Sequence, residues 1–268
     1  MDVRKTYKMY AGGEFIRSES GRSYRADGVN VPRGSRKDVR DAVVAARSAF
    51  GGWSRRTAMN RGQILYRAAE MLDGRRAQFV ALLGADRGAR REVERAVEVL
   101  VWYAGWTDKL AQVTGTVNPV AGPYFNFTLP EPTGVVGVVA PEKPGLLGLV
   151  LRLAPALCGG NTMVGLLSES RPLPGLTLAE VLATSDLPAG VVNLISGRRA
   201  ELLPWLAGHM NVNAIDAAGC TDEELAAVEK AAADSVKRVV RLSARDALSP
   251  YAVTSFMEFK TVWHPIGV

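Results

Sequence analysis

From Gly134 onward, short apolar segments alternate with longer helical ones, and this alternation constrains the fold more than any other feature of the sequence. The apolar segments are rich in β-branched residues and lack interleaved polar ones, which is typical of strands buried on both faces. Strands that alternate with helices in this way form a parallel sheet with helices on both sides, so we expect an α/β fold. The predicted strands are 134–140, 161–167, 191–195, 213–216 and 238–242, and the predicted helices between them are 146–157, 176–183, 201–207 and 221–236.

The chain before this region combines hairpins with amphipathic helices. Residues 7–24 alternate between apolar and polar and turn at glycines, which predicts a hairpin. Apolar residues at helical spacing then predict helices at 35–50, 57–72, 77–83 and 91–112. The first of these has Ser35 as its expected N-cap, with Asp38 three residues later. Two further strands, 114–120 and 124–129, surround a Gly-Pro turn, and 251–262 returns to strand-like alternation.

The net charge of +6 is spread unevenly along the chain. Residues 1–100 hold 21 basic and 12 acidic side chains, so the C-terminal part is slightly acidic. A basic half raises the hypothesis of a nucleic-acid or acidic partner. The arginines are scattered through amphipathic helices and are not clustered with exposed aromatic residues, so a solvated helix surface explains them better. We therefore expect no nucleic acid as a partner.

Several other classes are excluded by simple counts. The most apolar stretch, 134–160, is interrupted by charges and falls short of the ~20 apolar residues that a membrane span needs. The N-terminus has no apolar signal core, so we expect a cytoplasmic protein without membrane contact. Cys158 and Cys220 have no metal-ligand spacing, and neither do His209 and His264. No metal site is predicted.

The residues in several stretches resemble the aldehyde dehydrogenase superfamily over almost the full length. The most specific stretches are LAPALCGGNTMV at 153–164 and DLPAGVVNLISG at 186–197, supported by EPTGVVGVVAP at 131–141 and FMEFKTV at 256–262. The resemblance implies a Rossmann-like parallel sheet of the family's cofactor-binding domain and a small antiparallel oligomerisation sheet. It divides the chain into 1–113 (hairpin and helices of the cofactor-type domain), 114–130 (oligomerisation hairpin), 131–248 (Rossmann-like part) and 249–268 (C-terminal oligomerisation strand).

The same resemblance shows what is missing at the family's catalytic positions. In the family, a catalytic domain with a nucleophilic cysteine follows the cofactor domain, whereas here the chain reaches the oligomerisation-type strand about ten residues after Leu242. Leu242 also stands where the family has its general-base glutamate, and Cys220 where it has the serine of a glycine turn. No catalytic residue is therefore predicted, because both the nucleophile and the base are absent.

The family's cofactor positions are altered as well. Its Pro-Trp-Asn-Phe-Pro motif reads PEKPG here, with Lys143 in place of the asparagine, and Leu166 replaces the lysine that holds the adenosine ribose. The remaining candidates for cofactor contact are Pro141, Lys143, Glu169 and Gly219. We expect no cofactor, with weak, vestigial binding of NAD(P) as the alternative.

The glycine turn at 218–221 can be judged from its own residues. It follows a strand and opens a helix, a geometry that offers N–H groups to phosphate. However, Thr221 and Glu224 are spaced as a capping box, and Asp222 and Glu223 add two more carboxylates to the first turn. We therefore expect an ordinary capped helix that repels a pyrophosphate.

Three hypotheses for function follow from these observations. The leading one is a non-catalytic pseudoenzyme subunit that associates with a full-length aldehyde dehydrogenase, or with itself, and stabilises or regulates that enzyme. A second is an NAD(P)-dependent aldehyde oxidoreductase whose remodelled site uses Glu142, Lys143 and Glu169, and a third is a nucleotide-free module that binds an acidic partner. The predicted interface residues are Tyr124, Phe125, Phe127, Val253, Phe256, Phe259 and Val262.

Overall fold

A computed structural model describes residues 5–243 and 248–267, so the predicted units are described except at residues 1–4, 244–247 and 268. The centre of the fold is a seven-stranded sheet in the order β11-β10-β7-β8-β9-β1-β2. Its five parallel strands confirm the predicted α/β class. They are β7 (Val135–Val139), β8 (Thr162–Leu166), β9 (Val192–Ile195), β10 (Ala214–Asp216) and β11 (Arg238–Val240).

The N-terminal segment forms two hairpins where the sequence predicted one. The first, β1 (Met9–Ala11) with β2 (Glu14–Ile16), joins the central sheet antiparallel beside β9. The second, β3 (Ser23–Ala26) with β4 (Val29–Pro32), forms a separate two-stranded sheet. The central sheet is therefore mixed, because the first hairpin extends its β9 side.

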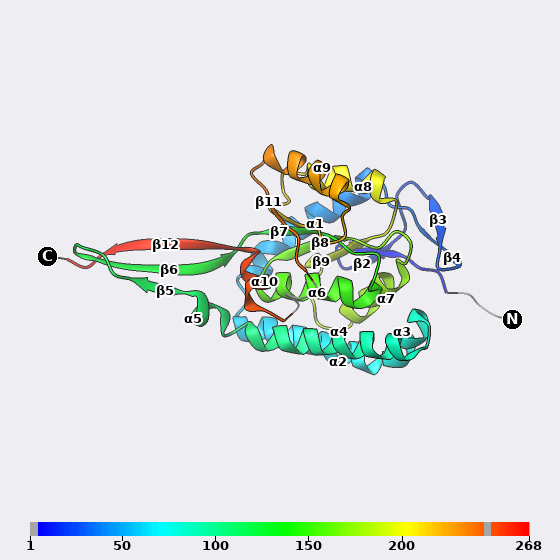
Figure 1. The fold of residues 1–268 in the computed structure, drawn as a ribbon, viewed down its shortest axis with the longest axis horizontal. Coiled ribbons are helices and arrows are strands. Elements are labelled where there is room, and N and C mark those ends of the chain that lie inside the picture. Colours follow the sequence, from blue (N-terminus) through cyan, green and yellow to red (C-terminus); the bar gives the residue numbers. More distant parts are fainter. Residues whose placement is uncertain (1–4, 244–247, 268) are drawn as a thin grey trace.

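Helices cover both faces of the central sheet (Figure 1). One face packs against α1 (Arg36–Ser54), α8 (Arg199–Ala207) and α9 (Asp222–Ala233). The other packs against α6 (Gly145–Cys158) and α7 (Leu173–Leu182), which are covered in turn by α2 (Ala58–Gly74), α3 (Arg76–Leu83) and α4 (Arg87–Trp106). Among the described residues, no helix is long and apolar enough to cross a membrane.

Buried residues of the predicted units 1–113 and 131–248 belong to the same hydrophobic cluster, so these two units share one core.

Two of the predicted helix boundaries are confirmed by their caps and one helix is corrected. Ser35 and Asp38 form the expected capping box of α1, and the Asp38 carboxylate also accepts from Ser18 Oγ at 2.8 Å. Thr221 and Glu224 form the capping box of α9. The single helix predicted over 91–112 is instead α4, which ends at Trp106, followed by α5 (Leu110–Thr114).

A three-stranded antiparallel sheet extends away from the body of the protein (Figure 1). It consists of β5 (Thr116–Asn118), β6 (Tyr124–Pro132) and β12 (Met257–Pro265), in the order β12-β6-β5, and we call it the arm. The strand predicted over 251–262 is wrong in its first half, because α10 (Pro250–Thr254) occupies that part. Pro250 at the first helical position and the Ser249 side chain, which accepts from Tyr251 N at 3.2 Å, begin α10 as a helix.

Candidate functional site

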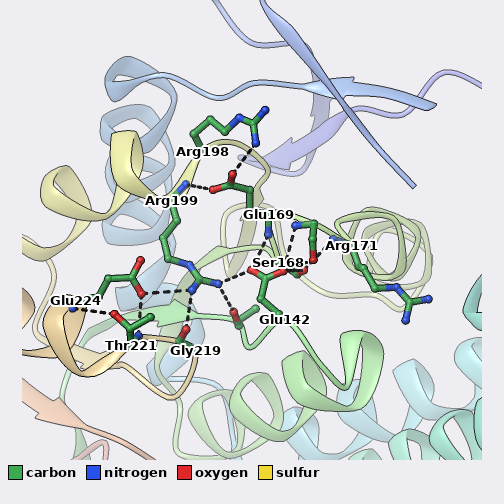
Figure 2. Close-up of polar contacts among 11 residues, drawn as sticks. Glu142, Ser168, Glu169, Arg171, Arg198, Arg199, Gly219, Thr221 and Glu224 are labelled. Carbon is green, nitrogen blue, oxygen red and sulfur yellow. Dashed lines mark hydrogen bonds and ion pairs between the residues drawn. The ribbon is translucent and has the colours of Figure 1, made fainter. Parts of the chain in front are cut away.

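The carboxyl ends of β7, β8, β9 and β10 form the edge of the sheet at which ligands bind in open α/β folds. The loops that follow these strands meet there, and an open hollow of about 630 Å³ lies between them. It is lined by Arg25, Ala26, Glu142, Glu169, Ser170, Arg198, Arg199, Ala200 and Glu224. Charged side chains of both signs dominate this lining, and Figure 2 shows that they point toward one another.

Arg199, the first residue of α8, is the centre of this cluster. Its guanidinium donates to the carbonyl of Gly219 at 2.7 Å and to the carbonyl of Ala140 at 3.3 Å. It also pairs with Glu142 at 2.6 Å and with Glu224 at 3.4 Å (Figure 2). The side chain is only 12% exposed. Arg199 therefore ties the loops after β7 and β10 together from within the site.

Glu142, in the loop after β7, is fixed by the loop after β8. Its carboxylate accepts from Ser168 Oγ at 2.6 Å, from the backbone N–H groups of Glu169 and Ser170 at 3.1 Å each, and from the Ser170 hydroxyl. Burial alone would raise the pKa of Glu142, but these hydrogen bonds to its charged form outweigh burial and lower that pKa. Glu142 is therefore held as an anion against Arg199.

Glu169 links the loop after β8 to the start of α8. Its two carboxylate oxygens accept from Arg198 Nη1 at 2.6 Å and from the backbone N–H of Arg199 at 2.8 Å. The Arg198 guanidinium lies 5.0 Å from the centre of the Tyr24 ring, in cation–π geometry. The N-terminus of α8 thus already holds a carboxylate of the same chain, in the place where a helix can bind an anion.

The glycine turn after β10 has no free donor among four successive backbone N–H groups. Ala218 donates to Asp216 Oδ1 at 2.9 Å, Gly219 to the carbonyl of Val139 at 3.0 Å and Cys220 to the carbonyl of Ala217 at 2.9 Å. Thr221 donates to Glu224 Oε2 at 2.9 Å, as the capping box predicts. A pyrophosphate at this turn would find occupied donors and a carboxylate, so the residues present do not fit a dinucleotide phosphate.

The predicted cofactor candidates separate into two pairs. Glu169 and Gly219 belong to the Arg199 cluster, where they bind other residues of the chain. Lys143 is exposed and Pro141 half-buried, and neither lines the hollow. The sequence analysis missed Arg198 and Arg199, although two arginines directly after Gly197, in the loop that follows a predicted strand, were a detectable signal.

Neither cysteine provides a nucleophile. Burial raises the pKa of Cys158 to about 12, although Arg61 lowers it slightly. Burial and the nearby Glu224 raise the pKa of Cys220 to about 11. Since the thiolate is the reactive form, both thiols are inert near neutral pH. Within the described part of the chain, no cluster of three or more His, Cys, Asp or Glu residues could hold a metal ion.

A buried charge pair joins α6 to β10. Arg152 Nε and Asp216 Oδ2 are 3.7 Å apart, and both side chains are buried. Arg152 also donates to the carbonyl of Leu242 at 2.7 Å. Burial raises the pKa of Asp216 to about 6, although Arg152 lowers it. The sequence analysis missed this pair. Its signal in the sequence was one basic residue, Arg152, and one acidic residue, Asp216, each within an otherwise apolar segment.

The predicted interface residues fall into two groups, one on the arm and one buried in the core. Tyr124, Phe125, Phe259 and Val262 are exposed on the arm, and Phe127 is half-buried there. Val253 and Phe256 were wrongly included, because α10 and the turn after it direct both side chains into the core. Exposed apolar residues of the arm that were not predicted are Val117, Leu129, Trp263 and Ile266.

Comparison with known proteins shows the family and the fold of the chain. Residues 25–254 match the model of the aldehyde dehydrogenase family. The chain belongs to this family. It is 33% identical over 252 residues to a putative aldehyde dehydrogenase of Bacillus subtilis, and 33% identical over 255 residues to human retinaldehyde dehydrogenase 3. These alignments cover 88% and 89% of the chain but 50% and 49% of the relatives.

Solved structures of aldehyde dehydrogenases show the same fold. An NAD⁺ complex of the Bacillus cereus enzyme superposes with a TM-score of 0.81 at 27% identity, covering 88% of this chain and 50% of that one. The enzyme HpcC of Thermus thermophilus gives a TM-score of 0.81 at 31% identity. This aldehyde dehydrogenase family member therefore spans about half the length of its relatives and has the fold of their nucleotide-binding part.

Proposed function

We propose that this family member is a non-catalytic subunit that binds a full-length aldehyde dehydrogenase through its arm and stabilises or regulates it. The observation that carries the proposal is the arm itself. It is a thin sheet whose aromatic and aliphatic side chains, among them Phe125, Leu129 and Val262, are exposed. Two- and three-stranded sheets without a covered apolar face are marginally stable in water, so a partner surface would stabilise the arm.

The charge pairs within the chain at the carboxyl edge support a role without catalysis. A pyrophosphate at the glycine turn after β10 would meet the Glu224 carboxylate and backbone donors that already have partners. Arg199, whose side chain is 12% exposed, pairs with Glu142 and Glu224, so displacing these carboxylates would leave a largely buried cation without its counter-charges. In this proposal the cluster replaces the cofactor as the group that joins the loops at this edge.

The connection between the two sheets supports the same conclusion. Only residues 241–249 lie between β11 of the central sheet and α10, which leads directly into β12 of the arm. By resemblance, the family inserts its catalytic domain at this point.

The two free cysteines of the chain are consistent with the reducing cytoplasm, which is where the proposal places the protein.

Co-expression with a full-length aldehyde dehydrogenase of the same organism tests the proposal. We expect the tagged chain to capture the enzyme at fixed stoichiometry and to change its thermal stability or rate. Phe125→Glu on the arm should abolish capture, whereas Tyr66→Glu, at an equally exposed aromatic residue of α2, should preserve it. Failure of the unmodified chain to capture any family member would refute the partner role.

The alternative function is an active oxidoreductase, and the NAD⁺ complexes of similar enzymes support it. Cofactor titration distinguishes the two functions. We expect no saturable binding of NAD⁺ or NADP⁺ in calorimetry, and no aldehyde-dependent formation of NADH. Saturable binding together with NADH formation would instead establish the alternative, an NAD(P)-dependent aldehyde oxidoreductase with a remodelled site.

A further inference from the structure

The two edges of the arm differ in how well they are protected from pairing with another strand. On one side, β5 covers only three residues of β6, and the uncovered part of β6 contains Pro130 and Pro132. Proline has no N–H group, so this edge offers few donors. On the other side, β12 runs for nine residues against β6 without a bulge. Its outer edge is long and regular.

The hydrogen-bonding pattern shows which residues of β12 face that open edge. Thr133 N donates to the carbonyl of Phe256 at 3.1 Å, and Ile266 N donates to the carbonyl of Pro123 at 3.0 Å. In an antiparallel pair, bonded and non-bonded residues alternate, so the even-numbered residues of β12 bond to β6. The odd-numbered residues Phe259, Thr261 and Trp263 therefore direct their N–H and C=O groups outward.

The charges on β12 do not guard this edge. Lysine on an edge strand commonly prevents pairing with another chain. The single lysine of β12, Lys260, forms an ion pair with Glu131 on the neighbouring strand β6. Glu258 is paired with Arg238 of the body at 3.0 Å. Both charges are therefore compensated within the chain.

We propose that two copies of this chain pair antiparallel through β12, about a two-fold axis at Thr261, and form one continuous six-stranded sheet. The sequence of β12 is complementary to itself about this residue. Thr261 faces its own copy, Phe259 faces the second copy's Trp263, and Glu258 faces the second copy's His264. Hydroxyl and aromatic cross-strand pairs of this kind stabilise antiparallel sheets, and Glu258 keeps its ion pair with Arg238.

The number of residues paired favours this register. A two-fold axis at Lys260 or Val262 keeps the same alternation but leaves two residues of each nine-residue strand unpaired, and the axis at Lys260 places two lysines directly opposite each other. An axis at Phe259 or Trp263 has the correct alternation but leaves four residues of each nine-residue strand unpaired. The axis at Thr261 pairs the strand from Glu258 to His264; beyond these residues the Met257 carbonyl accepts from Arg238 Nη1 at 2.7 Å and Pro265 has no N–H group.

This inference is independent of the proposed function, because it concerns the chain in the absence of another protein. If the chain both forms this homodimer and binds a full-length enzyme, the second copy and the enzyme would compete for the same arm. The homodimer would then have to open before the enzyme binds. Opening would expose the unpaired edge of β12.

Cysteine pairs test the register directly, because the native thiols are buried. Thr261→Cys should form a disulfide-linked homodimer on mild oxidation, since bonded cross-strand pairs lie about 5.5 Å apart at Cα, within disulfide range. Lys260→Cys and Val262→Cys should each stay unlinked alone but link when the two variants are mixed, since they face each other across the axis. Linkage of Lys260→Cys to itself, or no linkage of Thr261→Cys, would overturn the register.

Charge substitution at the axis tests the dimer in solution, with sedimentation velocity as the readout. Thr261 is exposed but its hydroxyl is hydrogen-bonded to that of Thr128 at 2.9 Å, so circular dichroism and thermal unfolding of each variant are compared with those of the unmodified chain. Thr261→Glu and Thr261→Lys should each raise the dimer dissociation constant at least about tenfold, because like charges face each other directly. An equimolar mixture of the two variants should restore the dimer. A monomeric unmodified chain, or a dimer that Thr261→Glu leaves unchanged, would overturn the proposal.

Discussion

Replacement of Arg152 by methionine should destabilise the protein in a strongly pH-dependent way. Arg152 on α6 and Asp216 on β10 are buried with Nε and Oδ2 3.7 Å apart. Methionine fills a similar volume but leaves the Asp216 carboxylate buried without its counter-charge. Removing one partner of a buried pair costs about 3–5 kcal/mol, so we expect a loss of this size in the free energy of unfolding at pH 8.

The protonation of Asp216 determines how this loss varies with pH. Burial raises the pKa of Asp216 in the folded protein to about 6, whereas its ordinary value is 3.8. The folded state therefore binds this proton more tightly than the unfolded state does. Protonated Asp216 contributes its full stabilisation of the folded state below pH 3.8, and this stabilisation is lost as the pH rises through 6. A pKa difference of about two units between the folded and unfolded states corresponds to about 3 kcal/mol.

Arg152 lowers the pKa of Asp216, so its removal should raise that pKa further. At pH 5 the carboxyl group of Arg152→Met is then neutral, and the loss of stability should be less than half of the loss at pH 8. Urea unfolding followed by tryptophan fluorescence at both pH values measures the difference. Arg152→Met/Asp216→Asn should recover most of the stability at pH 8, and Arg76→Met, at an exposed arginine, should cost little. An equal loss at both pH values would refute the reasoning.

Three further predictions concern the site and its supports. Thr221→Ala removes the N-cap of α9 and should cost about 1 kcal/mol of unfolding free energy in urea. Glu92→Ala removes the carboxylate that accepts two backbone N–H groups at the start of α6, at 2.8 and 3.1 Å, and should cost about 1–3 kcal/mol in the same assay. Cys158 and Cys220 should resist iodoacetamide at pH 8 until urea unfolds the chain, because pKa values of about 12 and 11 leave at most about 0.1% thiolate.

The fold was largely predictable from the sequence because its strands and helices differ strongly in pattern. The β-branched strands β7, β8 and β9 and the capping boxes at Ser35 and Thr221 were all detectable locally. The errors occurred where tertiary contacts or a single cap decide the outcome. The sequence alternation of 251–262 predicts a strand throughout, but Pro250 and the Ser249 cap begin a helix that buries Val253 in the core.

The candidate site was predictable only in part, because its essential contacts join loops far apart in the sequence. The carboxylates in the first turn of α9 and the loss of donors at the glycine turn were evident from spacing alone. The position of Arg199 was not, since its guanidinium reaches Glu142, which lies 57 residues earlier in the chain. Sequence spacing within one segment carries no information about such a contact.

The carboxyl edge and the arm differ in how their side chains are partnered, and this contrast is the basis of the proposed structural role. Ligand sites commonly contain polar groups whose partners are supplied by the ligand, whereas here Glu142, Glu169 and Glu224 are each compensated by arginines of α8 or its N-cap. The loops at the carboxyl edge are therefore joined to one another by residues of the chain itself. On the arm, by contrast, apolar side chains such as Phe125 and Phe259 are exposed and the odd-numbered residues in the middle of β12 direct their N–H and C=O groups outward, so another molecule can stabilise this sheet.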